Sequence, residues 1–137
     1  MDHKLRDYYL EFQIKNATPG QLLIMLYDGL IQNAESADAE MTAPSTPENR
    51  LQASHYVTRG INILTELNTS LKHGIDPSLC GSLSDLYLFF TREFSESFDT
   101  WRPERIRAIV PLMRDLRDAW SQADAVASAN KFQAVAA

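Results

Sequence analysis

The sequence predicts an all-α protein, an antiparallel up-down four-helix bundle with an N-terminal strap. Two observations support this fold. Helix-start signals, in which a polar residue precedes a proline, recur along the chain, and apolar residues after each start repeat every three to four positions. Alternating strand patterns are nearly absent. We expect three parts: an aromatic strap over residues 1–17, a bundle over residues 18–123 and a mobile tail over residues 124–137.

The first predicted helix begins after Thr18, with Pro19 in its first position. A threonine hydroxyl can accept a hydrogen bond from the amide of the third helical residue, and Gln21 can return one to the amide of the cap. Proline costs nothing at the first position because that amide has no intrahelical partner. The helix is expected to fade near Met41, and its apolar stripe is Leu23, Leu26 or Tyr27, Leu30, Ala34 and Ala37.

The second and third helices have the same kind of start. Thr46 and Pro47 open the second helix, and Gly74 is its predicted end. Asp76 and Pro77 open the third. The stripe of the second helix is Ala53, Tyr56 or Val57, Gly60 or Ile61, Leu64, Leu67 and Leu71. That of the third is Leu79, Leu83, Leu86 or Tyr87, Phe90, Phe94 and Phe98.

The fourth helix is predicted to begin near Pro103, without a good capping residue. Pro111 lies inside it and predicts a bend, because proline removes one helical hydrogen bond. Each helix should span roughly 20–25 residues, or about 30–37 Å. Similar lengths and short links favour an antiparallel bundle. The inward stripe of this helix is Ile106, Ile109, Met113, Leu116 and Trp120.

Composition limits the class of protein and its partners. The chain has 137 residues, 45% of them hydrophobic and 23% charged, as expected for one soluble globular domain. A lone Cys80 cannot form an internal disulfide, which fits a reducing compartment. The longest apolar run, residues 22–27, is far below the roughly 20 residues of a membrane span, and the charged residues 1–7 do not resemble a secretory signal. We therefore expect a cytoplasmic protein without stable membrane insertion.

The charges are distributed unevenly. The formal net charge of -5 argues against a nucleic-acid partner, which would require a basic face. Between Lys15 and Arg50 every charged residue is acidic, whereas five arginines lie between positions 102 and 117. We interpret most of these charges as solvated helix faces.

The first helix is apolar on more sides than a bundle requires. Leu22, Ile24, Met25 and Ile31 add apolar surface beside the core stripe. A wide core stripe is one explanation. The other is a groove for an amphipathic partner helix, closed by the strap, by another chain or by each in turn. Methionine suits such a groove because its flexible side chain adapts to irregular shapes.

Residues 18–29 read TPGQLLIMLYDG, and Tyr9, Gln13 and Ile14 precede them. In these residues the chain resembles the FliS family of flagellin export chaperones. Residues 60–67, residues 83–87 and the C-terminal Leu112, Leu116 and Trp120 are similar to later parts of the family in the same order. Together these pieces cover about residues 8–121.

The resemblance implies a cytosolic four-helix bundle that catalyses no reaction and needs no cofactor. Such a protein would bind the C-terminal segment of newly made flagellin, prevent its premature polymerisation and assist its delivery to the flagellar type III export gate. The candidate cargo-binding residues combine the groove with the strap of the family: Tyr9, Ile14, Leu22, Met25, Tyr27, Asp28, Ile63 and Leu67. Gly29 is expected to allow a close approach of two helices.

Other known functions of helical bundles have less support in the sequence. A di-iron bundle needs Glu-x-x-His pairs, which are absent, and the three histidines lack zinc-ligand spacing. A histidine phosphotransfer bundle is the main alternative, with His55 as the phosphorylated residue. Arg59 and Gly60 follow His55 one position later than expected for that class. A bundle that serves another flagellar or signalling partner is a third possibility.

Overall fold

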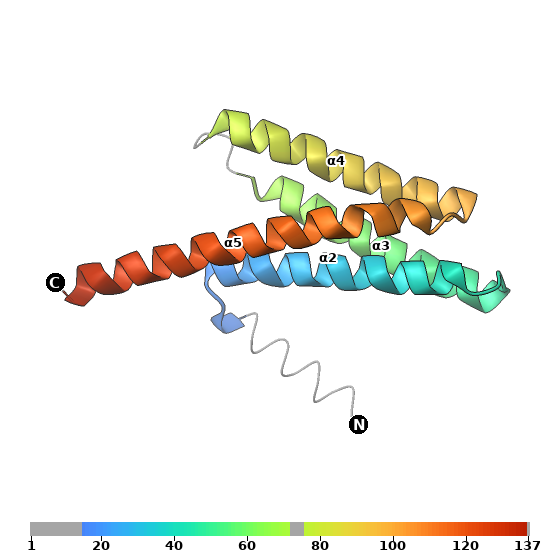
Figure 1. Ribbon diagram of the computed structural model, residues 1–137, viewed down its shortest axis with the longest axis horizontal. Helices are drawn as coiled ribbons and strands as arrows, with labels where there is room; N and C mark the ends of the chain where they lie inside the picture. The colour runs from blue at the N-terminus through green and yellow to red at the C-terminus, as the bar shows by residue number, and fades with distance from the viewer. Residues whose placement is uncertain (1–14, 72–75, 137) are drawn as a thin grey trace, which may run out of the picture.

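The computed structural model of the chain describes residues 15–71 and 76–136, the last six as backbone only. Its four long helices are α2 (Pro19–Thr42), α3 (Pro47–Thr69), α4 (Pro77–Thr100) and α5 (Glu104–Ala136). They run alternately up and down, as Figure 1 shows. No strand occurs in the described ranges. The predicted antiparallel four-helix bundle is therefore confirmed.

The helix starts follow the predicted capping chemistry. The amide of Gln21 donates to Thr18 Oγ1 at 3.2 Å, and the amide of Thr18 donates to Gln21 Oε1 at 2.9 Å, which completes the capping box of α2. Thr46 accepts from the amide of Asn49 at 3.1 Å, and Asp76 accepts from that of Leu79 at 3.0 Å. Each of these three helices carries proline in its first turn.

Two predicted helix ends differ from the structure. α3 ends at Thr69, before the predicted stop at Gly74, which lies outside the described residues. The amide of Ser70 still bonds to the carbonyl of Glu66 at 3.0 Å, and that of Leu71 bonds to the carbonyl of Asn68, which tightens the last turn. α5 passes through Pro111 as one helix of 33 residues, longer than predicted.

The predicted tail from residue 124 is helical because α5 continues through it to Ala136. The alanines of this stretch are strong helix formers. Figure 1 shows this part of α5 projecting past the start of α2. A side-chain carbon added to Gly20 would lie 2.0 Å from Asp124 Oδ1, so the lack of a side chain at Gly20 allows α5 to pass the first turn of α2 closely.

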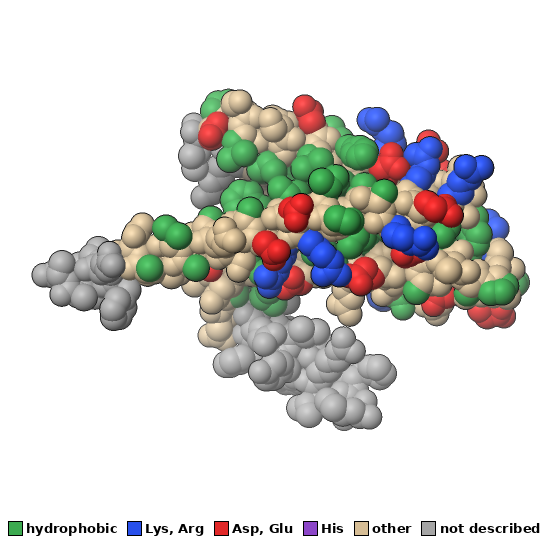
Figure 2. All heavy atoms as spheres, viewed as in Figure 1, with side chains coloured by type: hydrophobic (Ala, Val, Ile, Leu, Met, Phe, Trp, Pro, Cys, Tyr) green, Lys and Arg blue, Asp and Glu red, His purple; other side chains and the backbone are tan. Residues whose placement is uncertain are grey.

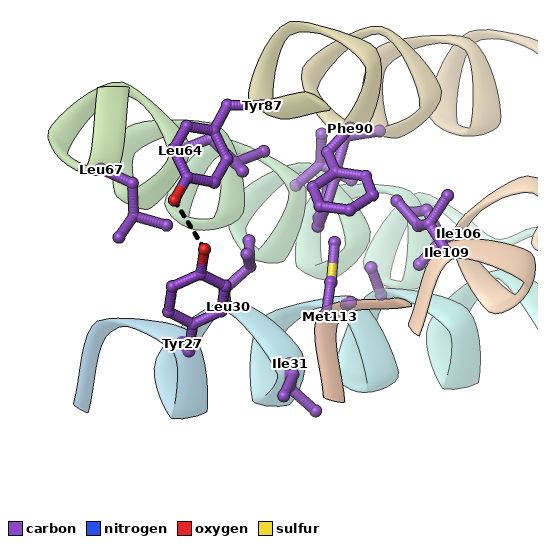
Figure 3. Close-up of a cluster of buried hydrophobic side chains, with 14 of the residues drawn as sticks. Tyr27, Leu30, Ile31, Leu64, Leu67, Tyr87, Phe90, Ile106, Ile109 and Met113 are labelled. Carbon is purple, nitrogen blue, oxygen red and sulfur yellow. Dashed lines mark hydrogen bonds between the residues drawn. The ribbon is translucent and has the colours of Figure 1, made fainter. Parts of the chain in front are cut away.

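The core runs along the middle of the bundle. Each helix contributes residues of its predicted stripe, although Leu79 in the stripe of α4 is exposed. The large, fully buried side chains include Tyr27, Leu30, Leu64, Phe90, Phe94 and Met113. Figure 3 shows several of these side chains converging from the four helices. α2 has extensive contacts with α3 and α5, whereas the contacts of α4 with α3 and α5 are less extensive.

Candidate functional site

An apolar pocket of about 360 Å³ lies at the end of the bundle where α2 and α4 begin. All four helices contribute to it, and its polar lining residues, Ser70 and Asp76, are exposed. The other lining residues are Leu23, Leu67, Leu71, Leu79, Cys80, Leu83, Tyr87 and Trp120. A concave apolar site of this size suits hydrophobic side chains of a ligand or partner.

A pair of tyrosines lies beside this pocket. The hydroxyl oxygens of Tyr27 and Tyr87 are 2.6 Å apart and share a hydrogen bond across the bundle (Figure 3). Burial raises the pKa of Tyr27, although its hydrogen bond with Tyr87 and the nearby indole of Trp120 partly offset this effect. Burial also raises the pKa of Tyr87, and the hydrogen bond with Tyr27 adds to the increase. Both hydroxyls are therefore neutral at physiological pH.

Trp120 brings a polar atom to the same place. Its indole nitrogen is buried and makes no hydrogen bond within the described part of the chain. The indole lowers the pKa of the Tyr27 hydroxyl, although the two groups do not form a hydrogen bond. The pocket therefore combines an apolar lining with one buried donor.

The first turns of α2 retain apolar surface next to this pocket. All five residues from 22 to 26 are half-buried rather than enclosed in the core. Leu22, Met25, Leu26 and Gly29 follow the helical spacing of a single face. Ile63 of α3 approaches this face, and its Cδ1 would lie 3.3 Å from a side-chain carbon on Gly29. The close helix approach predicted at Gly29 is thus observed.

The structure divides the predicted cargo-binding residues into three groups. Leu22 and Met25 on α2 and Ile63 on α3 are half-buried. Tyr27 and Leu67 are fully or almost fully buried in the core. Asp28 is exposed on the side of α2 that faces α5, and Tyr9 and Ile14 lie outside the described residues.

The ion pairs between α2 and α5 were not predicted. Arg117 Nε lies 2.8 Å from Asp28 Oδ1, Arg107 lies 2.8 Å from Asp38, and Arg114 pairs with Glu35. We call these three pairs the arginine ladder. Figure 2 shows the acidic and basic side chains alternating where α5 meets α2. The signal was present in the acidic first helix and the arginine-rich last one, but the interpretation as solvated faces missed their pairing.

The contribution of α4 to the pocket was also missed. The sequence placed Leu79 and Leu83 in a core stripe and Trp120 in another, without bringing them to one site. Leu79 is 48% exposed, and Leu112 on α5 is 46% exposed, so about half of each side chain is accessible to solvent. Figure 2 shows hydrophobic side chains gathered between α4 and α5. The periodic pattern identified the apolar face of each helix, but it could not show that a pocket lies where these faces meet.

The sequence was compared with protein families and with known proteins, and both comparisons indicate the same family. The family model "Flagellar protein FliS" matches residues 1–127 of the chain. The chain belongs to the FliS family. It is also similar to the flagellar secretion chaperone FliS of Bacillus subtilis (strain 168), with 29% identity over 118 residues, which covers 84% of this chain and 82% of the relative. Membership gives this FliS-family protein the role of a flagellar export chaperone.

The phosphotransfer alternative gains no support from the arrangement of α3 in this FliS-family chain. His55 and Arg59 are exposed, but Gly60 is buried. A side-chain carbon on Gly60 would lie 2.5 Å from the ring of Phe94, so this glycine serves the packing of α3 on α4. Packing accounts for Gly60 without a phosphotransfer site.

Across the described residues, no three histidine, cysteine, aspartate or glutamate side chains are grouped so that they could hold a metal ion. Within 15–71 and 76–136, no helix is both long enough and apolar enough to span a bilayer.

Proposed function

We propose that this protein is a cytoplasmic chaperone that binds the C-terminal segment of flagellin and keeps it from polymerising before export. It acts by stoichiometric binding rather than by catalysis. It then assists delivery of the cargo to the flagellar type III export gate. Family membership supplies the general role, and the apolar end of the bundle supplies the proposed binding site.

The observation that carries the proposal is the partly buried apolar surface at the start of α2. Residues 22–26 remain half-buried, and one of them, Leu23, lines the pocket between the helices. An amphipathic cargo helix could bury its apolar face there, with a gain of about 25 cal/mol for each Å² removed from water. Ordering the cargo segment offsets part of this gain, which leaves an affinity that permits release.

The predicted residues take different parts in this proposal. Leu22, Met25 and Ile63 contact the cargo, because they retain surface on one side of α2 and α3. Tyr27 and Leu67 support that surface from the core. Asp28 offers a carboxylate at its edge while it pairs with Arg117. Tyr9 and Ile14 belong to the proposed strap, which cargo and the export gate would recognise.

Calorimetric titration with a flagellin C-terminal peptide tests the proposal. We expect saturable binding in a 1:1 ratio and loss of binding when the apolar face of the peptide is made polar. Met25→Glu should weaken binding by about 2–3 kcal/mol, or roughly 30–150-fold, because it places an unpaired charge against the apolar face. The helical content should be unchanged, since Met25 is not in the closed core.

Leu51→Glu provides the matched control. Leu51 is 58% exposed in the first turns of α3, at the opposite end of the bundle from the pocket. This variant should bind the peptide as the parent chain does. The absence of saturable binding, or equal weakening by both variants, would overturn the proposed site, and a pull-down that recovers other partners but no flagellin would favour a different cargo.

Delivery to the export gate requires its own test. The chaperone–flagellin complex should bind the purified cytoplasmic part of the gate more tightly than the free chaperone does. Equal binding of the complex and the free chaperone would contradict the delivery role while leaving cargo binding intact.

A further inference from the structure

The two ends of α4 are enclosed to different degrees. Along its inner face Phe94 and Phe90 are 0% exposed, Tyr87 is 2% exposed, and Leu83 and Cys80 are each 7% exposed, whereas Leu79 beside Cys80 is 48% exposed. The C-terminal half of α4 is therefore enclosed, and its first turns form one wall of the apolar pocket.

The C-terminal end of α4 is held by several contacts. The ring of Phe94 occupies the space that a side chain on Gly60 would fill. Glu93 pairs with Arg105 of α5 at 3.1 Å, and the amide of Arg102 donates to the carbonyl of Ser97 at 2.9 Å. These contacts fix the junction between α4 and α5.

Trp101 stabilises the same junction. It ends α4 with a φ of 53°, a left-handed conformation that costs energy for a residue other than glycine. Its ring packs edge-on against Phe98 and lies 5.4 Å from the Arg50 guanidinium. Packing and a cation–π contact thus hold the turn in one conformation.

The opposite wall of the pocket is fixed independently of α4. The arginine ladder joins α5 to α2 at three points, and α2 also has its most extensive contacts with α3. In the described ranges, α4 and α5 are joined by the ion pair between Glu93 and Arg105, which lies at the held end. Movement of α4 at its other end would therefore leave the remaining three helices in place.

A buried hydrogen bond joins the first half of α4 to α2. Tyr87 lies between the enclosed half and the pocket, and its hydroxyl bonds to that of Tyr27 on α2 (Figure 3). Breaking this bond leaves two hydroxyls that water can reach only if the pocket opens. A single buried hydrogen bond at this position is suited to hold the closed arrangement.

We propose that the first half of α4 swings away from the bundle about a pivot at the α4–α5 junction, with the Tyr27–Tyr87 hydrogen bond as the latch. This motion enlarges the apolar pocket without unfolding α2, α3 or α5. It is a property of the chain itself and does not depend on the identity of the cargo.

Native-state hydrogen exchange of the full chain tests this inference. We expect the amides of residues 83–87 to exchange at least about 10-fold faster than those of residues 90–97, although both sets lie inside the same helix. The faster exchange should change little with low concentrations of denaturant, because a local swing exposes less surface than global unfolding. Uniform protection along α4, or one shared denaturant dependence, would overturn the proposal.

Removing the latch sharpens the test. Tyr87→Phe and Tyr27→Phe should each increase exchange of residues 80–87 by about 5–10-fold relative to residues 90–97. Tyr56→Phe, which removes a hydroxyl from a half-buried tyrosine of α3, should not change this ratio. The two variants remove the same hydrogen bond from different helices, so either variant is sufficient for the test if the other folds poorly. Equal acceleration in both halves of α4 would reject the pivot.

Discussion

The two sides of α5 show two ways of joining helices. Toward α2, three arginines pair with carboxylates along the seam. Toward α4, half-exposed apolar side chains such as Leu112 lie along the seam (Figure 2), and within the described ranges the ion pair between Glu93 and Arg105 lies at one end of it. The first seam has specific partners along its length, whereas the second leaves apolar surface that another molecule can use. We therefore regard α2, α3 and α5 as a stable frame, and α4 as the wall of the pocket that can move.

The largest effect is expected from truncating the held end of α4. Phe94→Ala should reduce the free energy of unfolding by about 3–5 kcal/mol, because it removes a fully buried ring and leaves a cavity beside Gly60. Leu79→Ala at the pocket should reduce it by less than about 1 kcal/mol, since nearly half of that side chain is exposed. Guanidinium unfolding curves would measure both, and similar losses would show that the two ends of α4 are held equally.

The tyrosine pair should give the next largest effect. Tyr87→Phe is expected to cost about 1–3 kcal/mol at neutral pH, because the hydroxyl of Tyr27 stays buried and loses its hydrogen-bond partner. Replacing both tyrosines with phenylalanine should cost less than the sum of the single changes, since no unpaired hydroxyl then remains. Chemical unfolding of the three variants checks this, and simple additivity would contradict a direct coupling.

The same pair predicts loss of stability in alkali. Both pKa values are raised by burial, so the unfolded chain loses these protons first, near pH 10. The contribution to stability is complete below about pH 10 and decreases as the pH rises toward the higher pKa values of the folded chain. Each tyrosine adds a slope of about 1.4 kcal/mol per pH unit, which the double phenylalanine variant should lack. A parallel alkaline profile for that variant would show that other groups cause the loss.

Much of the fold was predictable because its signals are local. The capping box at Thr18 and Gln21 and the start at Asp76 depend on residues within one turn of the helix. The core stripes depend on a period that the chain repeats. The end of α3 was not predictable from Gly74, because the final turn closes earlier through hydrogen bonds of Ser70 and Leu71.

The candidate site was only partly predictable because it depends on how distant faces meet. The sequence indicated surplus apolar surface around Leu22 and Met25, and these residues are half-buried. It could not show that Tyr27 reaches Tyr87, or that Trp120 lines the same pocket as Leu79. It also could not show that Asp28 pairs with an arginine far along the chain. These contacts depend on helix rotation and register, which a periodic pattern leaves open.

Three glycines offer a smaller test of how tightly each seam is packed. Gly60→Ala should destabilise the protein by about 1–2 kcal/mol, because its new carbon would lie 2.5 Å from the ring of Phe94. Gly29→Ala should be nearly neutral, since contact with Ile63 offsets the better helix propensity of alanine. Gly81→Ala in the free half of α4 meets open space and should stabilise by up to about 1 kcal/mol. Thermal melts would measure this order, and a reversed order would contradict the packing difference.

The smallest change in stability is expected from the arginine ladder. Arg117→Ala should lower Tm only slightly, because Arg117 and Asp28 are both partly exposed to water. The change should disappear in 1 M NaCl, where the screening length is only about 3 Å, whereas the loss caused by Phe94→Ala should persist. A ladder that fixes register has a second consequence: Arg117→Ala should increase hydrogen exchange in α5 more than in α4. If α4 responded more strongly, the ladder would act on the wall of the pocket rather than on the frame.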